Sequence, residues 1–458
     1  MHQSQYLGEE KIPKLLLRFS IPTIAGMLVN AIYNVVDRIF IGNSVGSLGI
    51  AGITIGFPIM LITMAFAMLV GLGATSLISI KMGERNEKEA ELILGNGIVL
   101  LILVSVLISG MGLFFLDPLL KLFGASAEVL PYAREYMQII LLGTIFMSTG
   151  FGMSNFIRAE GKPVISMYTM LIGAILNIIL NPIFIFGFGW GIKGAALATV
   201  LSRTVSTVWV VYYFLSARSY LKIQVKNFNL QMPYVWKILA IGSAPFAMQL
   251  SNSLLNVIMN KSLSDYGGDV AVAGIGVIMS VAVLMLMPVI GINQGAQPII
   301  GYNYGAGQFK RVKDTLKLAI WAATLIVCVG FVIIQLFPQQ IIYLFNRQDQ
   351  ALLQFGTHAL RIFLLFLPVI GFQIVGANYF QAVGKPKQAM FLSLSRQVLV
   401  LIPLILILPN FYGLDGILYA APVSDLTSAI LTGLFLYMEI RNLNEKTKAN
   451  MQPCSEGI

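Results

Sequence analysis

One apolar stretch carries polar side chains at helical spacing, and these residue types could bind a cation. Within residues 22–42, Asn30, Asn34 and Asp37 recur at intervals of four and three, so they share one face of a helix. A carboxylate inside an apolar membrane helix is costly and usually faces protein or a water-filled cavity. The stripe therefore predicts a cation site at Asp37. The alternative is that Asp37, five residues before Gly42, merely extends to the membrane interface.

Three further polar side chains are expected at the same depth as Asp37. Asn177 and Asn181 are four residues apart, on one face of their helix, and Thr199 comes early in the next helix. Carboxylate, amide and hydroxyl oxygens are hard ligands that suit Na+, and the carboxylate can carry a proton instead. We therefore expect a site for Na+ or H+ at Asp37, Asn177, Asn181 and Thr199. Hydrogen bonding between helices is the alternative role for the Asn and Thr side chains.

The elements that must position these residues are membrane-spanning helices. Of the 458 residues, 57% are hydrophobic and 11% are charged, and the mean hydropathy is +0.81. Twelve apolar runs of about 20 residues predict an all-α polytopic membrane protein. Because Lys and Arg gather in alternate loops, both termini are expected in the cytoplasm. Anionic lipid headgroups then account for the net charge of +10, and neither nucleic acid binding nor a cleaved signal peptide is expected.

The chain also contains an internal repeat. A shift of 222 residues takes Asn30 to Asn252, and the turn RAEGKP at 158–163 matches QAVGKP at 381–386 after a slip of one residue. The repeat predicts two six-helix lobes of the same orientation with a central cavity between them. The counterparts of the four cation-site residues are apolar or poor ligands, so the site is expected in the N-lobe alone. The predicted divisions are an N-lobe at 1–220, a cytoplasmic linker at 221–232, a C-lobe at 233–440 and a polar tail at 441–458.

Other intramembrane residues have roles that the sequence leaves open. Pro22 weakens the first helix and makes bending cheap, so it is a candidate hinge. Arg203, one turn beyond Thr199, could pair with Asp37 and compete with the cation, whereas Arg396 and Asp425 are expected to form a structural ion pair. Seven residues could line a cavity or instead pack between helices: Asn293, Gln294, Gln297, Gln373, Asn378, Met60 and Met64.

These residues and motifs resemble those of the MATE (multidrug and toxic compound extrusion) transporters, and the chain is similar to the bacterial MepA-like branch. The resemblance covers the whole chain and rests on VDRIFIG in the first helix, the RAEGKP turn, the run at 177–199 and GINQGAQPIIGYNYGA at 291–306. It implies an N-lobe cation site whose residues map to Asp37, Asn177, Asn181 and Thr199. The family usually has a second acid where Asn181 stands, and often an acid where Gln294 stands. Amides replace both here.

The expected function follows from these features and from what the sequence lacks. It contains no GxxxxGK[ST] phosphate loop, catalytic triad or Cys/His metal cluster, so neither ATP-driven transport nor an enzyme is expected. The prediction is a monomeric multidrug efflux antiporter of the bacterial inner membrane, without a cofactor. It is expected to export amphipathic, cationic small molecules in exchange for Na+ or H+ by alternating access. The alternatives are a flippase for a lipid-linked or amphipathic lipid and an ion-coupled transporter of a neutral metabolite. A channel is the least expected class.

Overall fold

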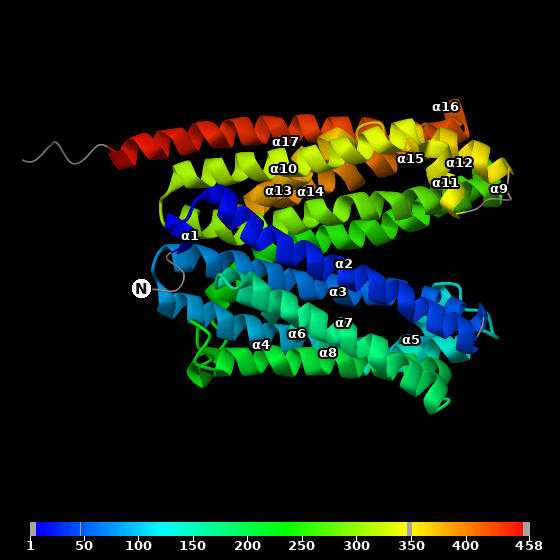
Figure 1. The fold of residues 1–458 in the computed structure, drawn as a ribbon, viewed down its shortest axis with the longest axis horizontal. Helices are drawn as coiled ribbons and strands as arrows, with labels where there is room; N and C mark the ends of the chain where they lie inside the picture. Colours follow the sequence, from blue (N-terminus) through cyan, green and yellow to red (C-terminus); the bar gives the residue numbers. More distant parts are fainter. Residues whose placement is uncertain (1–5, 46, 346–349, 452–458) are drawn as a thin grey trace, which may run out of the picture. The chain divides into compact units, whose positions relative to one another are not determined.

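The computed structural model describes the backbone of residues 6–45, 47–345 and 350–451, and it leaves undescribed the side chains at 34, 35, 38, 39, 42–45, 47, 269 and 449–451. These described stretches are helical and contain no strand (Figure 1). In them, eleven helices are long and apolar enough to cross a membrane. The pair α12 (Gln350–Phe363) and α13 (Leu367–Ala382), bent by 49°, provides a twelfth span. The predicted all-α membrane protein with twelve spans is therefore confirmed.

The chain divides into two compact units: unit 1 holds Met1–Leu7 and Ile21–Gln249, and unit 2 holds Gly8–Ser20 and Leu250–Ile458. In unit 1, α6 packs against α3, α4 and α8, and these helices run alongside one another (Figure 1). The elements of unit 1 are α2 (Ile12–Val45, from Ile21 onward), α3 (Ser47–Gly83), α4 (Glu87–Phe114), α5 (Leu116–Leu122), α6 (Leu130–Ala159), α7 (Pro163–Pro182), η1 (Ile183–Gly187), α8 (Gly191–Leu215) and η2 (Val225–Phe228), preceded by the start of α1 (Tyr6–Glu9).

Unit 2 is built around α13, which packs against α10 and α17. The long element α9 (Met232–Gly305) begins in unit 1, to which its residues up to Gln249 belong, and continues in unit 2. It is two helices, because Gly268 adopts φ 61° and ψ −161°, a conformation that is open to glycine and ends the first helix. The other elements of unit 2 are α10 (Phe309–Leu336), α11 (Pro338–Phe345), α12, α13, α14 (Pro386–Leu394), η3 (Ser395–Leu401), α15 (Ile402–Ile407), α16 (Pro409–Tyr412) and α17 (Leu414–Met451).

The N-terminal parts of α2 and α9 make matching close contacts in the two units. In unit 1, a Cβ added to Gly73 of α3 would lie 3.0 Å from the backbone N of Gly242 in α9. In unit 2, a Cβ added to Gly295 would lie 2.7 Å from Ser20 Oγ in α2. A shift of 222 residues relates Ser20 to Gly242 and Gly73 to Gly295. Small residues at these positions let the helices approach closely, and the contact explains why Gly8–Ser20 groups with unit 2. The lobes at 1–220 and 233–440 remain a prediction from the repeat.

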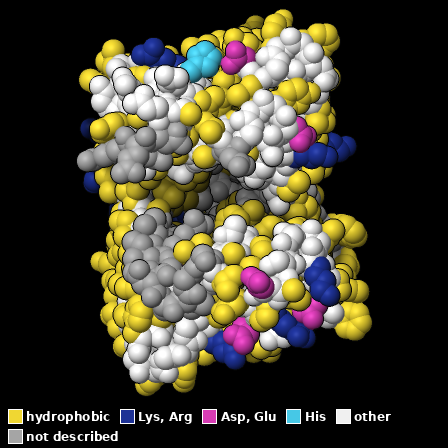
Figure 2. All heavy atoms as spheres, turned by 90° about the vertical axis from the view of Figure 1, so that its right-hand side faces the viewer, with side chains coloured by type: hydrophobic (Ala, Val, Ile, Leu, Met, Phe, Trp, Pro, Cys, Tyr) yellow, Lys and Arg dark blue, Asp and Glu magenta, His cyan; other side chains and the backbone are white. Residues whose placement is uncertain are grey.

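Figure 2 shows the end of the molecule at which α5, α11 and α16 lie. Charged side chains of both signs are scattered there among hydrophobic ones. In unit 1, Arg134 Nε lies 3.2 Å from Asp117 Oδ1, and Lys193 Nζ lies 3.2 Å from Glu135 Oε1. Both basic side chains are therefore paired with neighbouring acids.

Candidate functional site

Asp37, Asn181, Asn177 and Thr199 form one continuous chain of hydrogen bonds inside unit 1. Asn181 Nδ2 donates to Asp37 Oδ1 at 2.7 Å and to Asn177 Oδ1 at 2.9 Å. Asn177 Nδ2 donates to Thr199 Oγ1 at 3.2 Å. Four side chains from three helices, chosen from the sequence by type and depth, are thus adjacent in space.

The burial of this polar chain suits a bound cation. Asn181 is 0% exposed, Asn177 2% and Thr199 6%, while Asp37 is half-buried. The Oδ1 atom of Asn181 is buried and accepts no hydrogen bond from any residue whose side chain the structure describes. A buried oxygen without a donor is destabilising, and a hard cation would satisfy it. Among the described residues there is no cluster of three or more His, Cys, Asp or Glu side chains that would offer a different kind of metal site.

The site is positioned by the faces of α2, α7 and α8. On α2, the exposed apolar residues Ile21, Leu28 and Ile32 recur on one side, and Asp37 lies on the opposite side of the helix. The two asparagines occupy successive turns of α7, which ends at Pro182 and continues into the π-helical turn η1. Such π-turns are frequent at functional sites.

Arg203 binds neutral groups on α2 and does not pair with Asp37. Its Nη2 donates to Asn30 Oδ1 at 3.1 Å and to the Tyr33 hydroxyl. The guanidinium carbon also lies 5.2 Å from the centre of the Tyr33 ring, a cation–π distance. The competition between Arg203 and a cation for Asp37, which the sequence left open, is therefore absent from this structure.

The remaining residues of the α2 stripe do not reach the polar chain through any described contact. Asn30 Nδ2 donates to Gly26 O in its own helix at 3.1 Å, and its Oδ1 accepts from Arg203. The side chain of Asn34 lies outside the described residues. Pro22 lies inside α2, which remains helical on both sides of it. The hinge at Pro22 stays a prediction.

The seven candidate cavity residues differ in burial. Gln297 and Gln373 are buried, at 8% and 5% exposed, and Met64 is 38% exposed. Asn378 Nδ2 donates to Ile374 O of its own helix at 2.9 Å, which favours a packing role. The half-buried members are Asn293, Gln294, Asn378 and Met60. Substrate contact by these seven side chains stays a prediction.

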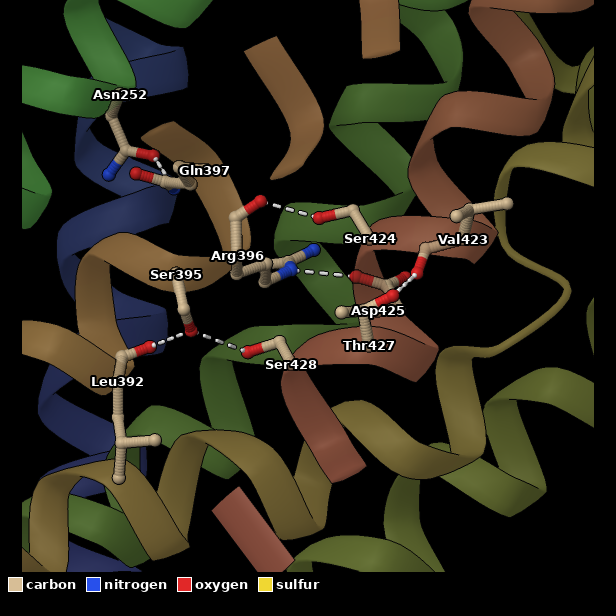
Figure 3. A network of polar contacts seen from close by, with 10 residues as sticks. All are labelled: Asn252, Leu392, Ser395, Arg396, Gln397, Val423, Ser424, Asp425, Thr427 and Ser428. Carbon is tan, nitrogen blue, oxygen red and sulfur yellow. Dashed lines mark hydrogen bonds and ion pairs between the residues drawn. The ribbon is translucent and has the colours of Figure 1, made fainter. Parts of the chain in front are cut away.

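Unit 2 contains a membrane-embedded ion pair on adjacent helices (Figure 3). Arg396 Nε donates to Asp425 Oδ1 at 2.7 Å, and Asp425 is 3% exposed. The Ser424 hydroxyl donates to the backbone oxygen of Arg396, which lies in the π-helical segment η3. The ion pair expected from the sequence is present, so each of these charges is balanced by a side chain of the same unit.

Glu160, in the turn between α6 and α7, is a buried acid that the sequence analysis did not single out. It is 1% exposed. Its carboxylate accepts hydrogen bonds from Ser219 Oγ at 3.0 Å, Leu221 N at 3.0 Å and the Tyr213 hydroxyl at 3.2 Å. Burial raises the pKa of Glu160 to about 7, although these hydrogen bonds and the charge of Lys162 lower it. The Glu160 carboxyl group therefore holds the segment after α8 against the RAEGKP turn. In the sequence, the feature that could have identified Glu160 is a single acid in a short turn between two apolar helices.

The fold and the site together define a class of protein. Twelve membrane spans, an internal repeat and a polar cluster built from helices of one half are the architecture of a secondary transporter. A family comparison gives the particular group. The chain belongs to the MatE family, whose model matches residues 22–183 and again residues 245–407. The two matches begin 223 residues apart, in agreement with the repeat.

Relatives and solved structures agree with this assignment. The chain is 29% identical over 446 residues to the multidrug export protein MepA of Staphylococcus haemolyticus, covering 97% of this chain and 98% of the relative. It is 27% identical to MepA of Staphylococcus aureus, covering 95% and 96%. An outward-facing multidrug resistance MATE family transporter superposes with a TM-score of 0.90 at 27% identity, covering 97% of this chain and 99% of the other.

A MOP superfamily transporter from Pyrococcus furiosus, whose binding pocket is described as having reverse polarity, superposes with a TM-score of 0.91 at 27% identity. That match covers 96% of this chain and 99% of the other. The members of this family are transporters, so the chain is a transporter and not an enzyme. Its apolar helices make it a multi-pass membrane protein.

Proposed function

We propose that this chain is a secondary-active multidrug efflux antiporter that exports amphipathic small molecules, cationic ones among them, in exchange for Na+ or H+. The multidrug export named for its relatives supports this substrate class. The observation that carries the coupling is the hydrogen-bonded chain from Asp37 to Thr199, in which Asn181 Oδ1 is buried and has no donor among the described side chains. A membrane carboxylate beside buried amide oxygens offers the hard oxygen ligands that Na+ prefers, and the carboxylate can carry a proton instead.

Ion binding at Asp37 would change the hydrogen bonds between α2 and α7. The Asn181 amide now points its N–H group at Asp37 Oδ1. Na+ attracts oxygen and repels an N–H dipole, so a bound ion favours rotation of the amide, which brings Oδ1 to the ion. The contact of Asn181 with Asn177 Oδ1 is then lost, and that oxygen also becomes available. The ion thereby alters how α2 is held to α7.

Exchange requires that the ion and the substrate favour different conformations of the transporter. A coupling free energy of about 1–3 kcal/mol is typical of such linkage, which is the scale of the hydrogen bonds that change at Asn181. Pro22 provides a weak point in α2 at which the helix could bend. We further propose that both termini are cytoplasmic, from the distribution of Lys and Arg in the loops. We propose outward flux from the export named for the relatives.

Gradient-driven dye efflux from proteoliposomes tests this proposal. Na+ and proton gradients are imposed separately, and wild type is compared with Asp37→Asn. The control is Asp117→Asn, which removes a carboxylate of α5 that contacts Arg134 and not the polar chain. We expect one gradient to drive efflux in wild type and in the control, and neither to drive it in Asp37→Asn. Unchanged efflux in Asp37→Asn would overturn the ion site, and wild-type protein that responds to neither gradient would overturn the antiporter.

A further inference from the structure

Arg203 occupies a position at which the other half of the repeat holds an acid. Arg203 lies twelve residues after Gly191, and Asp425 lies twelve residues after Gly413, the glycine that matches Gly191 in the repeat. Asp425 is balanced by Arg396 at 2.7 Å (Figure 3). The charge at this position is therefore reversed in unit 1.

The partner of that ion pair is missing from unit 1. Arg396 lies ten residues after Pro386 in the second QAVGKP turn, and the residue ten after the matching Pro163 is Gly173. A Cβ added to Gly173 would lie 3.8 Å from Arg203 Nη1 and 2.7 Å from Ser206 Oγ. Gly173 therefore lies beside the guanidinium but supplies no side chain, and Ser206 leaves little room for one. Unit 1 therefore has a charged residue, Arg203, at the position of Asp425, but it has no charged residue at the position of Arg396.

The guanidinium of Arg203 retains hydrogen-bonding capacity. Both of its hydrogen bonds come from Nη2, to Asn30 and Tyr33, and Nε and Nη1 donate to no acceptor in the described part of the chain. An arginine has five N–H donors in a fixed fork that matches a carboxylate. An intramembrane arginine held only by neutral groups is costly. An anion from outside the chain would satisfy the free donors and balance the charge.

Arg203 keeps an exposed fraction on the side of α8 that faces other helices of unit 1. The exposed apolar residues of α8, Leu201, Val205 and Val208, lie on one side of the helix, and Arg203 is half-buried on the other side. It is one helical turn from Thr199, and Tyr33 is one turn from Asp37, so the same two helices carry this group and the ion site.

We propose that Arg203 binds the carboxylate of an amphipathic substrate, so that the transporter accepts molecules with an anionic group as well as cations. This inference deepens the proposed function and rests on it for the transport step. Asn30 and Tyr33 hold Nη2 in place, while Nε and Nη1 meet the carboxylate. A substrate that carries both a carboxylate and a cationic group can use Arg203 and the Asp37 side of the site together.

A matched pair of fluorescent xanthene dyes tests this inference by binding alone. One dye carries a free carboxylate, and the other is its methyl ester, with the same cationic ring system. Fluorescence polarisation with purified protein in detergent gives each Kd without any ion gradient. In wild type we expect tighter binding of the carboxylate dye. In Arg203→Met we expect its Kd to rise about tenfold or more, the size of one charge-assisted contact, with little change for the ester.

The controls separate recognition from folding. Arg203→Lys keeps the charge and should retain most of the preference for the carboxylate dye, whereas a purely structural role would weaken both dyes together. Equal losses for the two dyes in Arg203→Met, or a wild-type protein that prefers the ester, would overturn the inference. The wild-type comparison holds even if Arg203→Met fails to fold. The binding assay uses no ion gradient, so it can disprove the anion site without testing antiport. The proteoliposome assay can disprove antiport without testing the anion site.

Discussion

Replacing Asn181 by leucine tests the ion site and identifies the ion at the same time. Asn181 Nδ2 donates to Asp37 Oδ1 at 2.7 Å and to Asn177 Oδ1 at 2.9 Å, and the side chain is 0% exposed. Leucine has a similar volume but neither the N–H donor nor the oxygen. A hydrogen bond to a charged group contributes about 1.5–3 kcal/mol, which corresponds to a change of roughly 10-fold to 150-fold in an equilibrium constant.

The direction in which the ion concentration for half-maximal efflux shifts depends on which ion is bound. If Na+ drives transport, Asn181→Leu removes an oxygen ligand, and the Na+ concentration for half-maximal efflux rises about tenfold or more. If a proton drives transport, the variant loses the donor that stabilises the ionised form of Asp37. The proton then binds more tightly, and half-maximal efflux occurs at a lower proton concentration by a similar factor.

The assay is dye efflux from proteoliposomes, measured over a series of Na+ concentrations at fixed pH and over a series of pH values without Na+. Asn181→Asp is the matched variant: it restores an oxygen beside Asp37 and adds a negative charge, so Na+ should bind more tightly than in wild type. The reasoning is refuted if folded Asn181→Leu protein shows wild-type midpoints in both series.

Three further predictions concern packing and charge outside the ion site. Because the pKa of Glu160 is about 7 in the folded protein against 4.5 in an exposed chain, its carboxyl binds a proton more tightly when buried. The attachment of the segment after α8 should then weaken by up to about 3 kcal/mol as pH rises from 4.5 to 7. Hydrogen exchange at Leu221 should show this pH effect in wild type and lose it in Glu160→Gln. Gly242→Ala places a Cβ 1.7 Å from a backbone oxygen of α3, so its Tm in detergent should fall by several degrees, whereas Gly110→Ala, with nothing within 4 Å, should leave Tm unchanged or raise it. Asp425→Asn should destabilise unit 2 by about 3–5 kcal/mol, and the double variant Arg396→Met, Asp425→Leu should recover most of that loss; a double variant as unstable as the single one would contradict the ion-pair account.

The sequence by itself determined the membrane class, the twelve spans and the repeat. These properties depend on local composition: the length of an apolar run sets a span, and turn motifs such as RAEGKP recur in order along the chain. The adjacency of Asp37, Asn177, Asn181 and Thr199 was also predictable. Membrane-spanning helices cross the same bilayer thickness. The number of residues between a side chain and the nearest turn therefore gives its depth, and these four side chains have similar depths. Cation binding by those residues remains a proposal.

Only the tertiary structure decided which polar groups meet across helices. Depth and spacing alone allowed Arg203 to pair with Asp37. The rotation of α8 relative to α2 instead places Arg203 beside Asn30 and Tyr33. The environment of Glu160 depends on a segment some sixty residues later folding back over its turn, as in the contact between Ser219 and Glu160. Such contacts are set by the rotation and packing of whole helices, which neither hydropathy nor periodicity encodes. The ion pair between Arg396 and Asp425 in unit 2 likewise shows that the counter-charge of Arg203 would stand at Gly173.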